Sequence, residues 1–176
     1  MTAAETVLIL HYDDQVSKNR FIPRGLKVDL WHLFAEDGQG EVLIGGDDAN
    51  NFFRIDVQRG DRRAVVEYEF YDDAEKFTAA LTRARVCELC LLDVAQGQDP
   101  VGLRLFQELE KLAQMTVRNV AFFTAYPSHV AAISGSTGQP SLFTKPDSHE
   151  RLNSFIKALI LSRFAKAGLS IPESGS

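Results

Sequence analysis

The stretch LCLLDV at residues 89–94 is the strongest indication of the fold, because it is a short apolar run that contains a carboxylate near its end. A run of this length and composition predicts a β-strand buried on both faces, as in a parallel sheet. The segment before it, residues 72–85, has a helical apolar period, and Asp72 and Glu75 have capping-box spacing. The segment after it, residues 101–114, has the same helical period. The stretch is therefore expected to be one strand of a sheet whose strands alternate with helices.

The same alternation continues to the C-terminus. Asp147, with Glu150 three residues later, is expected to cap the last and clearest helix. Pro23 and Gly25 interrupt the earlier segment of residues 15–35, which supports no single assignment. Buried strands that alternate with amphipathic helices predict a doubly wound, mainly parallel α/β sheet with helices on both faces. The remaining expected strands are 7–10, 119–124 and 141–144, and the remaining helices are 128–133 and 147–167.

The acidic charge is concentrated in one segment. Residues 36–75 hold 12 acidic and 4 basic side chains, whereas the remainder of the chain is net positive. Within it, residues 53–57 and 66–70 alternate between apolar and polar on either side of Gly60, which predicts an antiparallel hairpin. Two strands alone are marginally stable, so the hairpin must bury one face against the sheet edge or against a second protomer. The sheet edge is favoured, with one hairpin strand serving as the second strand of the sheet.

Length and composition limit the class of protein. The 176 residues fit one domain, expected at residues 1–167 with an insertion at about 36–72 and a flexible tail at 168–176. A net charge of −5 and a pI of about 5.4 argue against direct binding of nucleic acid or of an anionic membrane. The sequence has no membrane-length apolar run, no signal-peptide pattern and only two cysteines, so we expect a cytoplasmic protein.

Polar residues follow four of the expected strands. They are Asp13 and Asp14 after the first strand, Asp93 after the second buried strand, Thr124 with Ala125 after the next, and Lys145 after the last. In sheets of this type, ligands bind at the carboxyl ends of the strands. Three adjoining carboxylates repel one another unless a cation lies between them, and oxygen ligands favour Mg²⁺. A carboxylate beside Mg²⁺ can act as a nucleophile toward phosphorus.

This pattern resembles the receiver domain of bacterial two-component response regulators. The family has an acidic pair after strand 1, an Asp after strand 3, Thr/Ser-Ala after strand 4 and Lys-Pro after strand 5. Here these motifs are Asp13-Asp14, Asp93, Thr124-Ala125 and Lys145-Pro146, with 31 residues from Asp93 to Thr124 and 21 from there to Lys145. The resemblance covers about residues 5–15 and 72–166.

The resemblance implies a fold and a set of roles. The fold would be a five-stranded, flavodoxin-like (CheY-like) sheet of order 2-1-3-4-5, with an extra antiparallel hairpin near strand 2. Asp93 would accept a phosphoryl group. Asp14, Asp93 and the backbone carbonyl of Ala95 would ligate Mg²⁺, with Asp13 helping through water. Thr124, Ala125 and Lys145 would bind the phosphoryl oxygens.

Three departures from the family pattern stand out. Asp14 and Asp93 lie 79 residues apart, some 35 more than a receiver needs, and the acidic hairpin segment accounts for the excess. The position of the family's aromatic switch residue, three before the lysine, holds Leu142, with Phe143 beside it. His11 and Tyr12 replace the apolar pair that usually precedes the acidic pair.

The leading functional hypothesis is a phosphoacceptor receiver that takes its phosphoryl group from a histidine kinase or a phosphotransfer protein. It would not be an enzyme beyond self-phosphorylation and autodephosphorylation, and it would act through protein contacts, possibly as a homodimer. The alternative is a pseudo-receiver, an interaction module that phosphorylation does not regulate. A phosphohydrolase of similar topology is disfavoured, because Ala95 stands where its second aspartate is expected.

Overall fold

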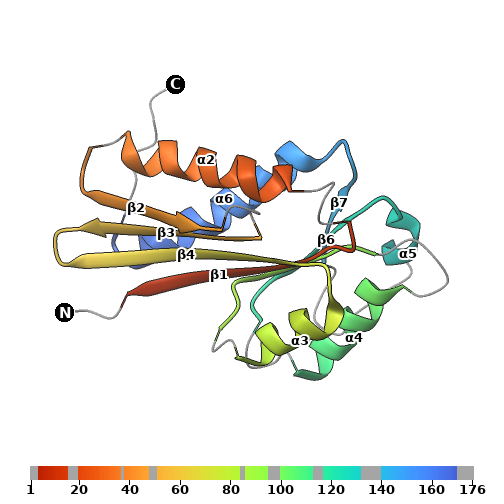
Figure 1. Cartoon of the computed structure of the whole chain (residues 1–176). Coiled ribbons are helices and arrows are strands. Elements are labelled where there is room, and N and C mark those ends of the chain that lie inside the picture. Colours follow the sequence, from red (N-terminus) through yellow and green to blue (C-terminus); the bar gives the residue numbers. More distant parts are fainter. Residues whose placement is uncertain are drawn as a thin grey trace.

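The structure is a computed structural model that describes residues 4–15, 20–36, 38–47, 51–83, 86–94, 100–112, 117–131 and 140–169. Seven strands form one sheet in the order β2-β3-β4-β1-β5-β6-β7 (Figure 1). The strands are β1 (Glu5–Tyr12), β2 (Glu41–Gly46), β3 (Phe52–Arg59), β4 (Arg62–Tyr71), β5 (Leu89–Leu92), β6 (Val120–Thr124) and β7 (Ser141–Thr144). The helices are α2 (Phe21–Ala35), α3 (Ala74–Arg83), α4 (Val101–Leu112), α5 (Pro127–Ala131) and α6 (His149–Lys166).

The parallel part of the sheet has the expected order. β1 pairs in parallel with β4 on one side and with β5 on the other, and β5, β6 and β7 continue in parallel. With β4 counted as the second strand, β4-β1-β5-β6-β7 is the order 2-1-3-4-5. The expectation of five strands is wrong in number, because the sheet has seven strands and is mixed.

The acidic segment supplies the additional strands. β3 and β4 form the expected antiparallel hairpin, with Arg59 opposite Arg62 and a turn in which Gly60 has a φ of 61°. That positive φ favours glycine over residues with a side chain. The hairpin joins the parallel sheet beside β1, as favoured from the sequence, and β4 takes the place of the second strand. β2 pairs antiparallel with β3 and extends the sheet by one strand that the sequence pattern did not predict.

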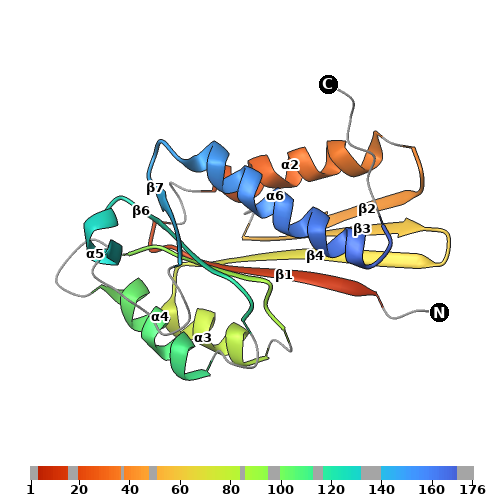
Figure 2. The same cartoon turned by 180° about the vertical axis from the view of Figure 1, so that it is seen from behind.

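Helices cover both faces of the sheet, and each face has its own core (Figures 1 and 2). α2 and α6 cover one face, where Ile22, Leu26 and Ile156 are fully buried. α3 and α4 cover the other face, where Phe77 and Phe106 are buried. The two core clusters explain why β1 and β5 are apolar almost throughout: both of their faces are buried.

Helix α2 occupies the segment that the sequence left unassigned. Pro23 is the third residue of this helix, in the first turn, where a backbone N–H has no intrahelical partner and its loss costs little. The buried residues Ile22, Leu26, Leu30 and Phe34 recur every four positions and give the helix one apolar face. Burial of this face therefore outweighs the helix-breaking tendency of Pro23 and Gly25.

Two predicted helix caps are wrong. The Oδ1 atom of Asp73, not a carboxylate oxygen of Asp72, accepts a hydrogen bond from the backbone N–H of Lys76 at the start of α3. Ser148, not Asp147, precedes the first residue of α6, and its side chain makes no capping hydrogen bond. Both shifts are by one residue, which periodicity alone does not resolve. Among the described residues, none of the helices combines the length and apolar character that a membrane span requires.

Candidate functional site

The ends of four parallel strands meet at one edge of the sheet, on the right in Figure 1. Backbone hydrogen bonds continue the strand pairing into the loops: the N–H of Asp13 donates to Tyr71, and the N–H of Asp93 donates to Tyr12, both at 2.9 Å. The N–H of Lys145 donates to the carbonyl oxygen of Thr124, also at 2.9 Å. The residues that the sequence singled out are thus held on a continuous hydrogen-bonded frame.

Lys145 joins two of the predicted carboxylates. Its Nζ atom donates hydrogen bonds to Oδ2 of Asp13 and to Oδ2 of Asp93, each at 2.7 Å. Asp13 is fully buried and Asp93 is 4% exposed, while Lys145 is partly buried. The other oxygen of Asp13, Oδ1, accepts a hydrogen bond of 2.7 Å from the backbone N–H of Gln15. A partly buried ammonium between two buried carboxylates offsets much of the cost of removing these charges from water.

A third carboxylate, that of Asp14, lies beside this pair. One oxygen atom from each of Asp13, Asp14 and Asp93 lies within 4.8 Å of the other two. Asp14 is exposed, so the cluster opens to solvent on its side. Oδ1 of Asp93 is buried and has no hydrogen-bond partner among the described residues. Three convergent carboxylates, one with a free buried oxygen, fit a hard divalent cation such as Mg²⁺.

The surroundings of Asp93 favour its protonated form. Burial, and after it the neighbouring charge of Asp13, raises the pKa of Asp93 to about 7, although Lys145 acts in the opposite direction. A carboxyl group whose pKa is raised chiefly by burial and by a like charge is the kind of group that occurs at functional sites. A cation bound there would lower this pKa, because positive charge favours the ionised carboxylate.

The predicted phosphate-binding residues lie at the same edge. Thr124 is fully buried; its hydroxyl lies 3.4 Å from the carbonyl oxygen of Val94 and accepts a 3.0 Å hydrogen bond from the N–H of Tyr126. Ala125, the next residue, is exposed. Ala95, the predicted carbonyl ligand, lies outside the described residues. The structure therefore brings Asp13, Asp14, Asp93 and Lys145 together and places Thr124 at the end of the intervening strand.

A buried polar pair lies beneath the acidic cluster. A hydrogen bond of 2.7 Å joins Nδ1 of His11 to the hydroxyl of Tyr68, and the ring of Phe70 stacks on His11. Nε2 of His11 is 3.9 Å from Oδ2 of Asp13. Burial lowers the pKa of His11 to about 3, so the imidazole is neutral at neutral pH. Sequence reasoning noted His11 as unusual but missed Tyr68, whose place on the buried face of an alternating strand was the available signal.

Gly102 fixes the position of α4 relative to Asp93. A β-carbon built at Gly102 would lie 1.9 Å from the backbone carbonyl oxygen of Asp93, which is closer than any real contact. Only glycine allows the first turn of α4 to approach the strand end this closely.

Leu142 occupies the position at which the family that the sequence resembles usually has an aromatic switch residue. Leu142 is 37% exposed. Phe143 is buried, and the centroid of its ring lies 5.3 Å from that of the Phe155 ring on α6. Because neighbouring residues of a strand point to opposite faces, Phe143 cannot replace Leu142 at the surface.

Comparisons with known proteins identify the fold. The receiver domain of the Francisella response regulator 1452 has a TM-score of 0.50 and 18% sequence identity, with 88% of this chain and 96% of that chain covered. A two-component transcriptional regulator AraC from Clostridium phytofermentans has a TM-score of 0.50 and 17% identity, with 92% of this chain and 98% of that chain covered. No protein-family model and no curated protein matches the sequence.

The chain therefore has the fold of a response-regulator receiver domain, and its acidic cluster and lysine lie at the strand ends where ligands bind in such sheets. At these identities the likeness defines the fold alone.

Proposed function

We propose that the protein is a phosphoacceptor receiver, phosphorylated on Asp93 in a two-component or phosphorelay signalling system. The observation that carries this proposal is the asymmetry of the Asp93 carboxylate. Lys145 holds Oδ2 at 2.7 Å, whereas Oδ1 is buried and has no partner within the described part of the chain. One oxygen is thus fixed by an ammonium, and the other is left to act as a nucleophile.

The proposed chemistry transfers a phosphoryl group to Oδ1 of Asp93. A lone pair of this oxygen forms the new bond to phosphorus, while the phosphorus–nitrogen bond of a donor phosphohistidine breaks. The bonding electrons leave with the imidazole nitrogen, which takes a proton from solvent. The product is an acyl phosphate on Asp93. Lys145 and Thr124 would bind the phosphoryl oxygens, together with the backbone at Ala125.

Asp13, Asp14 and Asp93 would hold a Mg²⁺ ion, with the carbonyl of Ala95 as the ligand implied by the family resemblance. Such an ion supplies positive charge that offsets the repulsion among the carboxylates and the charge on the transferred phosphoryl group. The donor would be a histidine kinase or a phosphotransfer protein, and the output would be a phosphorylation-dependent protein contact. In this account the protein has no catalytic activity beyond phosphorylating and dephosphorylating itself.

Intact-mass spectrometry tests the proposal. The protein is incubated with acetyl phosphate and MgCl₂, with EDTA in place of the metal as the control. We expect a mass gain of one phosphoryl group that requires Mg²⁺ and that disappears slowly after the donor is removed. An unmodified mass under all conditions would contradict the proposal and favour an interaction module that phosphorylation does not regulate.

A further inference from the structure

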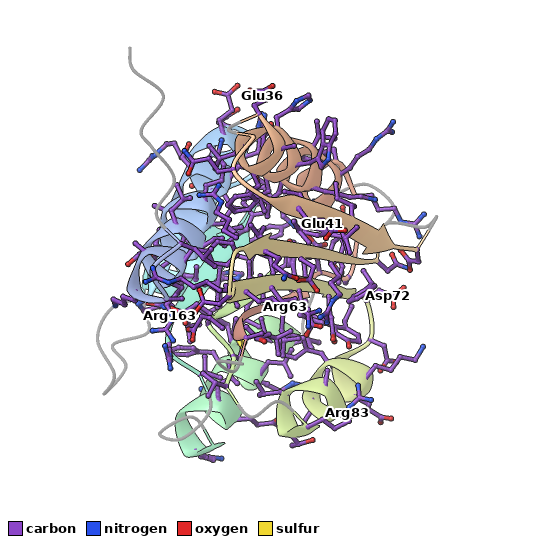
Figure 3. All side chains as sticks on the ribbon, turned by 90° about the vertical axis from the view of Figure 1, so that its left-hand side faces the viewer. Glu36, Glu41, Arg63, Asp72, Arg83 and Arg163 are labelled. Atoms are coloured by element: carbon purple, nitrogen blue, oxygen red, sulfur yellow. The ribbon has the colours of Figure 1, made fainter. Side chains whose placement is uncertain are left out.

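β2 is an edge strand of the sheet, and on its outer side it pairs with no other described strand. The N–H of Asp47 donates to the carbonyl oxygen of Phe52, which shows that odd-numbered residues at this end point their backbone groups toward β3. In an antiparallel pair these directions alternate along the strand. Val42 and Ile44 therefore present their N–H and C=O groups outward. Figure 3 shows this strand, with Glu41 labelled, beside α2.

Large apolar side chains are exposed along this edge. Leu43 is 58% exposed and Ile44 is 39% exposed, one on each face of the strand. Ile44 pairs with Ile55 of the α2-side core, so it lies on the same face as α2. On α2, the Lys27 ammonium lies close to Gly46. Trp31 lies one turn further along, on the same side of the helix, and is 41% exposed. An open strand edge flanked by exposed apolar side chains is a site for strand addition.

We propose that the partner at this edge is a second copy of the chain, whose β2 pairs antiparallel with β2 across a twofold axis at Leu43. When a twofold axis perpendicular to the sheet relates two identical antiparallel strands, one residue must stand opposite the same residue of the other copy. With Leu43 at the axis, Val42 faces the second copy's Ile44, and the two share the outward backbone hydrogen bonds. Trp31 of each copy then lies on the same face of the joined sheet as these aliphatic side chains.

Charge favours this register over the one centred on Ile44. With Leu43 at the axis, Glu41 stands opposite the second copy's Gly45, above which no atom lies within 4 Å of a β-carbon position. Gly45 pairs with Arg54 on β3, whose guanidinium binds Glu67 and Asp56, so Glu41 of one copy meets open space on the other rather than a second carboxylate. An axis at Ile44 would instead place Glu41 opposite Asp47, a like-charge pair that is destabilising. Both copies contribute the same contacts, so the interface closes as a dimer.

The proposal is independent of phosphorylation, and analytical ultracentrifugation across a concentration series tests it. We expect the wild type to dimerise. Gly45→Glu should raise the dimer dissociation constant about tenfold, equivalent to about 1.4 kcal/mol, because it places a second carboxylate opposite that of Glu41. The Glu41→Lys/Gly45→Glu double variant should restore dimerisation, because an ammonium then faces the introduced carboxylate across the axis. A further variant, Ile44→Pro, removes an outward N–H that β3 does not use and should also favour the monomer.

Melting temperatures of the variants check that each remains folded. Because Gly45 has open space above it and lies beside Arg54, Gly45→Glu should not unfold the monomer. A wild type that remains monomeric at its highest soluble concentration would overturn the proposal. So would a folded Gly45→Glu variant that dimerises like the wild type, or a double variant that stays as monomeric as Gly45→Glu.

Discussion

Nζ of Lys145 donates a hydrogen bond of 2.7 Å to Oδ2 of Asp93. The two residues follow β7 and β5, which are separated in the sheet by β6. Lys145 therefore reaches across the end of the intervening strand to hold the carboxylate that we propose as the phosphoryl acceptor. Together with the hydrogen bond from Lys145 to Asp13, which follows β1, this contact joins three strand ends, and it leaves the other oxygen of Asp93 unpartnered among the described residues.

Removal of this ammonium should destabilise the metal-free protein. Lys145→Met leaves the buried carboxylates of Asp13 and Asp93 uncompensated, which typically costs roughly 3–5 kcal/mol. We expect the lower end of this range, because the pKa of Asp93 is already raised to about 7 and the group can take up a proton. Urea unfolding in EDTA measures the change. The control is Lys157→Met, which removes a more exposed ion pair with Asp29 and should cost less than about 1 kcal/mol. Equal effects of the two substitutions would contradict the predicted role of Lys145.

Asp14 should be required for binding Mg²⁺. Its exposed carboxylate supplies one of three oxygens that converge within 4.8 Å. Asp14→Ala should abolish Mg²⁺ binding in calorimetry and leave the metal-free protein as stable or slightly more stable, because one repulsive charge is removed. Asp147→Ala, at an exposed aspartate after Lys145 and outside the cluster, is the control and should leave the affinity unchanged. Unchanged Mg²⁺ affinity in Asp14→Ala would exclude this carboxylate as a ligand.

Gly102→Ala should disturb the acceptor, although Gly102 carries no functional group. The added methyl group would lie 1.9 Å from the carbonyl oxygen of Asp93, so either α4 or the strand end must move. We expect a loss of stability of about 1–3 kcal/mol, typical of overpacking, and slower phosphorylation by acetyl phosphate. Gly25→Ala is the matched control, since its added methyl group would meet only the Asn153 side chain at 3.7 Å. That substitution within α2 should stabilise the protein by up to about 1 kcal/mol. A Gly102→Ala variant with wild-type stability and phosphorylation rate would show that the contact is unimportant.

The stability of the added strands should depend on pH through Asp56. A hydrogen bond from Arg63 holds the pKa of Asp56 below its usual value of 3.8, with a smaller contribution from Arg54. A carboxyl group whose pKa is lowered on folding stabilises the fold above its unfolded pKa, and this contribution is lost as the pH falls through the folded value.

Asp56→Asn should therefore destabilise the protein at pH 7 by about 1 kcal/mol or less, since Arg54 and Arg63 are partly exposed. The difference should shrink below pH 3.8, the usual pKa of the group. Urea unfolding of both proteins at a series of pH values measures it, and a difference that stays constant down to about pH 3 would contradict the assignment.

The sequence predicted the parallel core because its central strands, such as β5 and β6, are buried on both faces. Runs such as residues 89–94 are apolar for that reason, and the helices between them have amphipathic periods that are easily recognised. The hairpin of β3 and β4 was predictable for the complementary reason: one of its faces is polar, so the period of two is visible.

The rest of the fold depends on contacts between distant segments. β2 ends in Gly45 and Gly46 and exposes most of its side chains, so it has no alternation to detect and is held by its ladder with β3. α2 contains Pro23 and Gly25, and only the buried face formed by Leu26, Leu30 and Phe34 explains why it is helical. Local propensity is a weak guide where tertiary burial decides the conformation.

The candidate site also contains both residues that the sequence predicted and contacts that it did not. Asp13, Asp14, Asp93 and Lys145 were predictable, because strand ends that carry polar residues must meet at one edge of a parallel sheet. The hydrogen bond between His11 and Tyr68 was not, because it depends on the parallel register of β1 with β4, in which Ile9 stands opposite Tyr68. That register follows from packing across 57 residues of sequence rather than from any local pattern.

Chemical trapping identifies the residue that accepts the phosphoryl group. The protein is phosphorylated with acetyl phosphate and Mg²⁺, reduced with borohydride, which converts an aspartyl phosphate to homoserine, and digested for peptide sequencing by mass spectrometry. Our account predicts homoserine at position 93 alone in the wild type and none in Asp93→Asn, with both proteins folded by circular dichroism. Homoserine at another aspartate, or its continued formation in Asp93→Asn, would contradict the assignment of Asp93 as the phosphoryl acceptor.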